Sequence, residues 1–233
     1  MQISVSLRLA DRSTREIPLR DLSSKLAFDA IPWRRVRSYR GQRHMPGLYW
    51  SATTGDHVVY ESRLELARLL LADIDHEVVD IAAKPFLVRE KGRRHIPDFL
   101  LGRADGSTVV VNVKPAGGTR TVLVTDTLAW AGRVFASKGW EHELWTGADP
   151  QLLANVRFLS GYRRGVLLQP RDIAVGSSLL QREAGMTIGG AEAALRRAGV
   201  SQPRPVVLHL LWSGLLRARL DCPLTGGTEL EVV

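Results

Sequence analysis

An apolar hairpin near the middle of the chain constrains the fold most. Residues 96–101 (IPDFLL) are followed by the turn pair Asp105-Gly106 and then by residues 108–114 (TVVVNVK). Asp-Gly between two runs of strand-forming residues is a strong signal for two antiparallel strands joined by a tight turn. The sequence therefore predicts a β-hairpin over residues 96–114.

Segments with helical and strand patterns lie on both sides of this hairpin. Strands are expected at 44–60 (as a pair turned at 54–56), at 77–88 and at 140–146, and helices at 62–73, 125–138 and 150–164. Such an order of strands and helices is typical of an α/β core built on a mixed sheet flanked by helices.

The pattern changes after about residue 165. Short helices are expected at 171–183, 187–198 and 204–214, followed by two strands within 215–233. Three helices followed by a hairpin is the order of a winged-helix module. We therefore expect one domain over 1–165 and a small winged-helix domain over 166–233; the alternative is a small α+β cap with no role in nucleic-acid binding.

The charge of the chain points to a polyanionic partner. The 233 residues include 32 Lys and Arg against 24 Asp and Glu, a formal net charge of +8. Residues 1–60 carry ten cations and five anions, residues 161–233 carry nine and six, and the centre is balanced at 13 and 13. Nucleic acid or an anionic surface suits such a chain, with basic ends around a neutral centre.

The densest basic segment, residues 33–44, interleaves arginines with aromatic residues. It includes Arg34, Arg35 and Arg37 beside Trp33 and Tyr39. This mixture suits phosphate contact with base stacking, and removing the three arginine charges should then flatten the salt dependence of DNA binding. The alternative is an ordinary solvated strand or loop.

Cysteine content and hydropathy limit the kinds of site and the cellular location that this chain can have. Cys222 is the single cysteine, so internal disulfides and a thiolate zinc site are excluded. No apolar run approaches the ~20 residues of a membrane span, and the first ten residues lack the apolar segment of a signal peptide. We expect a cytoplasmic protein without a membrane partner.

Polar residues interrupt the apolar segments at four positions, Glu65, Asp98, Asn112 and Lys114. Asn112 and Lys114 are two residues apart, so on a strand they share one face. An even-numbered hairpin loop would pair Asp98 with Val113 and place Asp98 on the other face, whereas an odd loop or a bulge brings the groups together. We expect an odd loop or a bulge.

The chemistry that such a cluster suits is phosphodiester hydrolysis. Carboxylates such as Glu65 and Asp98 are hard oxygen ligands for Mg²⁺, which neutralises a phosphate oxygen and lowers the pKa of bound water, while Lys114 could orient that water. The structural alternatives are a helix-capping role for Glu65, which stands three residues after Ser62, and a solvated strand face for Asn112 and Lys114.

These residues resemble a known pattern. Pro97-Asp98 and Asn112-Val113-Lys114 across a hairpin resemble the PD-(D/E)xK nuclease signature, and Ser62 to Glu65 resembles the S-x-L-E motif of the TnsA family, the endonuclease subunits of heteromeric cut-and-paste transposases. Further similar segments are 31–33 (IPW), 64–66 (LEL), 78–81 (VVDI), 94–100 (RHIPDFL) and 155–163 (NVRFLSGYR). The resemblance covers residues 31–163, and the expected winged helix agrees with the family's two-domain plan.

The resemblance implies a restriction-endonuclease-like fold and a metal-dependent cut of the 5′ strand at each transposon end. By it, Glu65, Asp98 and Lys114 take the catalytic positions, and Glu65, Asp98, Asn112 and the Val113 carbonyl would hold one or two Mg²⁺ or Mn²⁺ ions. Implied partners are double-stranded transposon-end DNA, a TnsB-like DDE transposase and a TnsC-like AAA+ ATPase regulator. We expect DNA contacts from Arg34, Arg35, Arg37, Arg93, Arg94 and His95.

One departure keeps other functions open. Most nucleases of this signature carry Glu where this chain has Asn112, and TnsA proteins carry a neutral Gln. Loss of a carboxylate weakens metal binding, since fewer negative charges face the ion. The alternatives are a catalytically silent DNA-binding and assembly subunit, and a stand-alone restriction or repair nuclease of the same fold.

Overall fold

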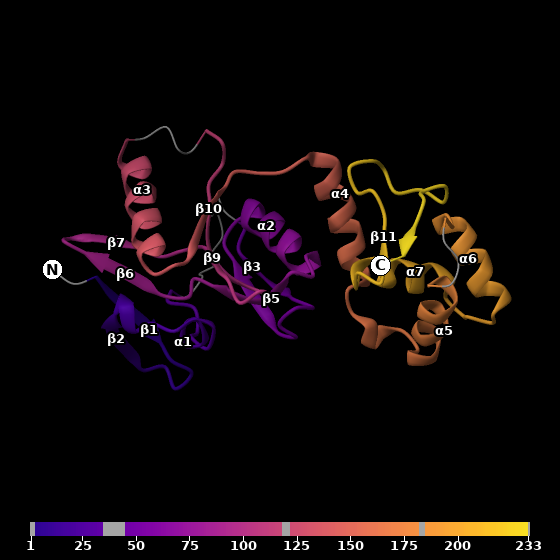
Figure 1. The fold of residues 1–233 in the computed structure, drawn as a ribbon, viewed down its shortest axis with the longest axis horizontal. Helices are drawn as coiled ribbons and strands as arrows, with labels where there is room; N and C mark the ends of the chain where they lie inside the picture. The colour runs from indigo at the N-terminus through magenta and orange to yellow at the C-terminus, as the bar shows by residue number, and fades with distance from the viewer. Residues whose placement is uncertain (1–2, 35–44, 118–121, 182–184, 233) are drawn as a thin grey trace. The chain divides into compact units, whose positions relative to one another are not determined.

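Helices and strands form a mixed α/β structure in which mixed and antiparallel sheets are flanked by helices (Figure 1). The computed structural model describes residues 3–34, 45–117, 122–181 and 185–232. The chain divides into two compact units, residues 1–147 and 148–233. The sequence pattern places the boundary later, near residue 165, so the helix α4 (Pro150–Leu159) falls in the second unit here.

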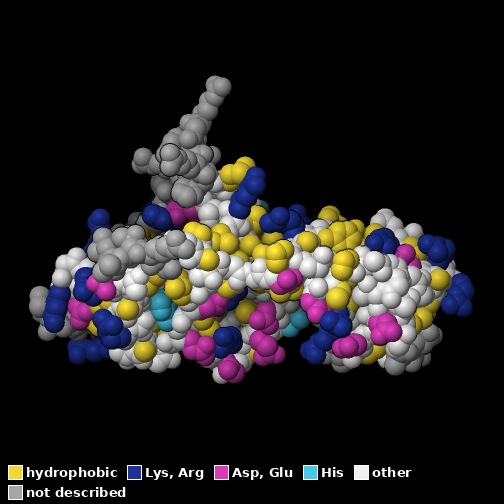
Figure 2. All heavy atoms as spheres, turned by 90° about the horizontal axis from the view of Figure 1, so that it is seen from above, with side chains coloured by type: hydrophobic (Ala, Val, Ile, Leu, Met, Phe, Trp, Pro, Cys, Tyr) yellow, Lys and Arg dark blue, Asp and Glu magenta, His cyan; other side chains and the backbone are white. Residues whose placement is uncertain are grey.

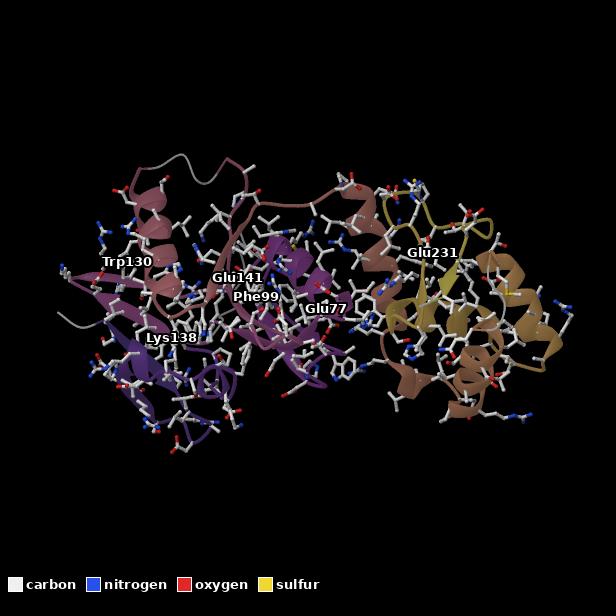
Figure 3. The ribbon with its side chains drawn as sticks, viewed as in Figure 1. Glu77, Phe99, Trp130, Lys138, Glu141 and Glu231 are labelled. Atoms are coloured by element: carbon white, nitrogen blue, oxygen red, sulfur yellow. The ribbon has the colours of Figure 1, made fainter. Side chains whose placement is uncertain are left out.

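The central sheet of the first unit contains the hairpin and has the order β10-β9-β8-β5. Its strands are β5 (Val78–Ala83), β8 (Phe99–Arg103), β9 (Thr108–Val113) and β10 (Glu141–Trp145). β10 runs parallel to β9 and the other pairs are antiparallel, as a mixed sheet requires. Phe99 lies at the start of β8, within the centre of this unit (Figure 3).

The hairpin between β8 and β9 has the odd loop that the sequence predicts. Phe99 faces Val111 and Gly102 faces Thr108, so the same register places Asp98 opposite Asn112. The amide of Arg103 donates to the carbonyl of Ser107 at 2.9 Å, which leaves residues 104–106 as the loop. Gly106 takes a φ of +83°, a conformation that glycine adopts at little cost.

A second, antiparallel sheet has the order β2-β1-β6-β7. Its strands are β1 (Ser4–Arg8), β2 (Thr14–Pro18), β6 (Leu87–Glu90) and β7 (Arg93–His95). A separate hairpin joins β3 (Gly47–Trp50) to β4 (His57–Tyr60) at the expected position. The sequence pattern predicted no element for residues 1–30, which also hold the short turn η1 (Leu19–Asp21) and the helix α1 (Ser24–Phe28).

Two longer helices complete the first unit. α2 (Arg63–Ile74) begins after Ser62, as predicted, and α3 (Val122–Ser137) contacts β7 and β10 (Figure 1). Trp130 of α3 lies over the second sheet, where its indole N–H donates to the Glu90 carboxylate at 2.7 Å (Figure 3). One apolar core includes residues from both sheets and from α3. Burial of this core orders the strand ends that carry the polar groups.

The second unit is helical. It contains α4, the turns η2 (Ser160–Tyr162) and η3 (Gly165–Leu167), the helices α5 (Pro170–Leu180), α6 (Ile188–Arg197) and α7 (Pro203–Trp212), and the short antiparallel pair β11 (Leu216–Arg217) and β12 (Glu231–Val232). The expected order of three helices followed by two strands is therefore present. The helix expected over 150–164 ends at Leu159 and continues as η2.

α7 is the central helix of this unit. It contacts α4, α5, α6, η2 and β11, and six of its residues are buried: Val206, Val207, Leu208, Leu210, Leu211 and Trp212. A Cβ at Gly176 of α5 would lie 2.7 Å from Val206 Cγ1, so glycine permits the close approach of α5 to α7.

Among the described residues, no helix is long and apolar enough to cross a membrane.

Candidate functional site

Glu65 lies in the first turn of α2, where the helix start fixes its backbone. The Glu65 amide donates to Ser62 Oγ at 3.1 Å, the helix cap that the sequence predicts. The carboxylate turns back as well, but its Oε2 accepts from the amide of Glu61 at 2.9 Å and not from Ser62. The side chain is buried, with 7% of the residue exposed. Capping therefore accounts for only part of its environment.

Asp98 is buried immediately before β8. Its backbone amide donates to the carbonyl of Val111 at 3.0 Å, and its Oδ2 accepts from the amide of Val113 at 2.7 Å. The carboxylate thus takes the place of a backbone acceptor between the two strands. Because Oδ2 is fixed in this way, Oδ1 is the oxygen left for a cation.

Lys84 brings the two carboxylates together, although the sequence pattern did not predict it as a site residue. Its Nζ donates to Asp98 Oδ1 at 2.5 Å and to Glu65 Oε2 at 3.2 Å, and lies 3.3 Å from Glu61 Oε2. The residue is fully buried, at 0% exposure. The available signal was a lone lysine at the end of the apolar strand β5, directly before Pro85.

The backbone of Lys84 is held in an unusual conformation. Its φ is +49°, a region that residues other than glycine rarely occupy. Its amide donates to the Asp98 carbonyl at 3.0 Å, and its carbonyl accepts from the Trp33 amide at 2.8 Å. Strained residues of this kind persist where the surrounding structure fixes them, often at functional sites.

The charged groups in this cluster shift the pKa values of one another. Burial alone would lower the pKa of Lys84, but the carboxylates of Asp98 and Glu65 outweigh it, and the pKa is raised. Burial alone would raise the pKa of Asp98, but Lys84 and Lys114 outweigh it, and that pKa is lowered. Burial raises the pKa of Glu65 more than Lys84 lowers it. Asp98 and Lys84 therefore form the charged centre of the cluster.

Asn112 is held by two histidines from other strands. Its Oδ1 lies 3.1 Å from His95 Nε2 of β7 and 2.9 Å from His142 Nε2 of β10. Burial lowers the pKa of both histidines, which favours neutral rings that each donate one N–H. In this orientation the amide nitrogen of Asn112 is buried and has no hydrogen-bond partner among the described residues. The amide oxygen is engaged with imidazoles, not with the carboxylates.

A cationic pocket lies beside this cluster. Its volume is about 590 Å³, and its lining includes Arg34, Arg94, His95 and Lys114 together with Trp33. Lys114 is close enough to Asp98 to help lower the pKa of that carboxyl. Arg34 also forms an ion pair with Glu61, which links the pocket wall to the acceptors of Lys84. This group of charges can bind a phosphate next to the buried carboxylates.

The structure brings most of the predicted residues into one neighbourhood. Glu65 and Asp98 share one ammonium, and Arg34, Arg94, His95 and Lys114 line one pocket. Arg93 is exposed on β7 and does not line that pocket, while Arg35 and Arg37 lie outside the described residues. In the view of Figure 2, the Lys and Arg side chains of the described residues are scattered among Asp and Glu.

The two carboxylates are a suitable donor set for a hard divalent cation. Glu65 Oε2 and Asp98 Oδ1 already converge on one positive charge, and among the described residues Lys84 is the cation that pairs with them. Carboxylate oxygens are the ligands that Mg²⁺ prefers. The residues present therefore fit a metal ion, on the condition that the ammonium of Lys84 leaves.

A scan against protein-family models finds no match to this chain, and no curated protein matches it. The similarity to the nuclease signature therefore depends on the residues described above and on their arrangement.

Proposed function

We propose that this chain is the metal-dependent DNA endonuclease subunit of a cut-and-paste transposase. The first unit would be a restriction-endonuclease-like domain and the second a winged-helix domain. One observation carries the proposal: Glu65 and Asp98, from separate segments, converge on one cation at 3.2 and 2.5 Å. They do so beside a cationic pocket that contains Lys114, the third residue of the signature.

Each residue has a defined task in phosphodiester hydrolysis. Glu65 and Asp98 would hold the divalent ion, which neutralises a phosphate oxygen and lowers the pKa of bound water. Arg94 and Lys114 bind the negative phosphate in the pocket, and Lys114 orients the attacking water. The Val113 amide fixes Asp98 through Oδ2 and so keeps Oδ1 directed at the cation.

Asn112 has a positioning task in this proposal. Its amide is held between His95 and His142, and His95 also lines the pocket. The amide therefore fixes the His95 ring at the pocket wall. With a neutral residue at this position, Glu65 and Asp98 supply the only two carboxylates of the signature, and their charge balances a single divalent ion.

The second unit would bind DNA or a protein partner through surfaces other than α7. α7 is covered by its neighbours, whereas Arg196 and Arg197 of α6 and Arg217 of β11 are exposed. The proposed partners are double-stranded transposon-end DNA, a TnsB-like DDE transposase and a TnsC-like AAA+ ATPase. The TnsB-like subunit would cut the other strand.

A second candidate, a silent DNA-binding and assembly subunit, is favoured by one observation. Lys84 already pairs with both carboxylates, so the cluster has a counter-ion without a metal ion. A buried ion pair of this kind can be purely structural. In that case the pocket would still bind phosphate, and no strand would be cut.

Cleavage of paired transposon-end DNA with Mg²⁺ or Mn²⁺, in the presence of the partner transposase, tests these candidates. Asp98→Ala should lower the 5′-strand cleavage rate by roughly 100-fold or more, because one of two metal-holding carboxylates is lost. Asp105→Ala is the matched control, an exposed aspartate in the loop of the same hairpin, and should cleave as the wild type does.

Equal cleavage by the wild type and Asp98→Ala would make the nuclease proposal wrong. Retained DNA binding without cleavage would support the silent subunit. Robust cleavage by the isolated chain, without the transposase, would indicate a stand-alone nuclease.

A further inference from the structure

We propose that Lys84 is a tethered cation that competes directly with the divalent metal ion for Glu65 and Asp98. The inference rests on the proposed function, because it concerns the metal site of that function. It adds a specific property: the carboxylate pair binds a divalent ion only when the Lys84 ammonium has moved away.

The competition follows from shared atoms. Lys84 Nζ lies 2.5 Å from Asp98 Oδ1 and 3.2 Å from Glu65 Oε2, the oxygens that converge on one point. Mg²⁺ binds carboxylate oxygens at about 2.1 Å, so the ion and the ammonium would need the same position. The two cations also repel each other strongly in a buried site. Both cannot occupy the carboxylate pair at once.

Glu61, which also pairs with Arg34, is the remaining acceptor near Lys84 for a displaced ammonium. Glu61 Oε2 lies 3.3 Å from Lys84 Nζ, and the Glu61 side chain is 23% exposed, whereas that of Lys84 is fully buried. The backbone of Lys84 is fixed by hydrogen bonds at its amide and carbonyl, but its four-carbon side chain is flexible. A change of side-chain rotamer toward Glu61 would free the pair and keep one ion pair for the lysine.

The consequence is weak metal binding by the isolated chain. Each divalent ion must replace an ion pair that already neutralises Asp98, and part of its binding free energy is spent on that exchange. Lys84 also protects the two buried carboxylates from mutual repulsion when no metal is bound. A lysine in this position therefore sets the metal concentration at which the site fills.

Direct Mn²⁺ binding, measured by electron paramagnetic resonance on the full chain without DNA, tests the proposal. Lys84→Met keeps the length and apolar stem of the side chain and removes its charge. It should bind Mn²⁺ about tenfold more tightly or better than the wild type, which corresponds to about 1.4 kcal/mol of competition. Adding Asp98→Asn should abolish the gain.

Lys91→Met is the matched control. Lys91 has a φ of +48°, close to the +49° of Lys84, but it is exposed and forms no ion pair that the described structure shows. Its Mn²⁺ affinity should equal that of the wild type. Circular dichroism spectra establish that each variant is folded before binding is measured.

The outcomes separate the two proposals. Equal affinity of the wild type and Lys84→Met, with loss of binding in Asp98→Asn, would leave the metal site in place and overturn the competition. Failure of both proteins to bind Mn²⁺ would overturn the metal site of the proposed function and the competition with it.

A second measurement on the wild type covers the case in which Lys84→Met does not fold. Acetylation by acetic anhydride, read by mass spectrometry, reports the accessibility of each lysine. Lys84 should be protected without metal and should react faster with saturating Mn²⁺, while exposed Lys91 reacts equally in both. Bound Mn²⁺ with unchanged protection of Lys84 would overturn the proposal.

Discussion

The helix α2 carries a buried carboxylate near each end, and the two are stabilised in different ways. Near the start, Glu65 is bound by the charged ammonium of Lys84. In the last turn, Asp73 is 4% exposed, and the donors that it accepts from within the described part of the chain are uncharged. These donors are the Tyr49 hydroxyl at 2.6 Å, the Ser51 hydroxyl at 2.5 Å, and the amides of Ala52 and Thr53 at 3.0 and 2.9 Å.

This difference separates a structural carboxylate from an exchangeable one. The donors to Asp73 belong to the β3–β4 hairpin and include two backbone amides, which cannot leave without breaking the turn. The donor shared by Glu65 and Asp98 is the end of one flexible side chain. A metal ion can replace a single ammonium far more easily than a set of fixed amides.

The largest expected effect is on the structural carboxylate. Asp73→Ala should lower the free energy of unfolding by roughly 3–5 kcal/mol, because four buried or half-buried donors lose their acceptor. Urea denaturation followed by circular dichroism measures this loss. The control is Asp75→Ala, an exposed residue that accepts from the Glu77 amide at 3.0 Å, which should cost less than about 1 kcal/mol. Equal losses in the two variants would remove the distinction.

An intermediate effect is expected at the exchangeable cluster. In a metal-free buffer, Lys84→Met should cost roughly 2–3 kcal/mol, since it leaves Glu65 and Asp98 as unpaired buried charges. Adding Asp98→Asn should recover part of this loss, although it removes a second charged group. Urea denaturation of the single and double variants measures the recovery. A double variant that is less stable than Lys84→Met would contradict the description of Lys84 as a counter-ion.

The smallest effect is expected at Asp80, a carboxylate with few partners. Burial raises its pKa above the ordinary value of 3.8, and repulsion from Asp29 adds to the rise, while the Ile81 amide donates to Oδ1 at 2.9 Å. The ionised form therefore costs stability above that pKa. Asp80→Asn should gain a few tenths of a kcal/mol at pH 7, since solvent screens this half-buried group.

The sign of the Asp80 effect gives its test. A group whose pKa is raised on folding stabilises the folded state while it is protonated. Its contribution to the free energy of unfolding is complete below the pKa of the unfolded state and is lost as the pH rises through the pKa of the folded state. The gain from Asp80→Asn should therefore disappear as the pH falls below 3.8. Thermal melts of both proteins from pH 3 to pH 7 compare them, and a gain that grows at acid pH would show the assignment to be wrong.

Local elements followed from the sequence because near neighbours decide them. Ser62 caps α2 through its hydroxyl, and Asp105-Gly106 turns the hairpin. The requirement that Asp98 share a neighbourhood with Asn112 predicted the odd loop, which the register confirms. Capping and turn chemistry depend on a few adjacent residues, so a single sequence is sufficient for them.

The position of α7 shows the opposite case. The sequence predicted the bounds of α7 closely. The apolar pattern of α7, however, did not indicate which elements pack against it. α4, which the sequence grouped with the first domain, contacts α7 in the second unit. The coverage of a helix depends on packing between elements that are distant in the sequence, and periodicity alone carries no information on it.

By itself, the sequence determined the hairpin, the start of α2 and the identity of Glu65, Asp98 and Lys114 as the candidate residues. Only the tertiary structure decided that Lys84 lies between the two carboxylates and that His95 and His142 hold Asn112. The physical reason is that buried charges and amides take whichever partner the packing supplies. Here that packing joins the ends of α2, β5 and β8, and no local pattern in the sequence records where those three ends meet.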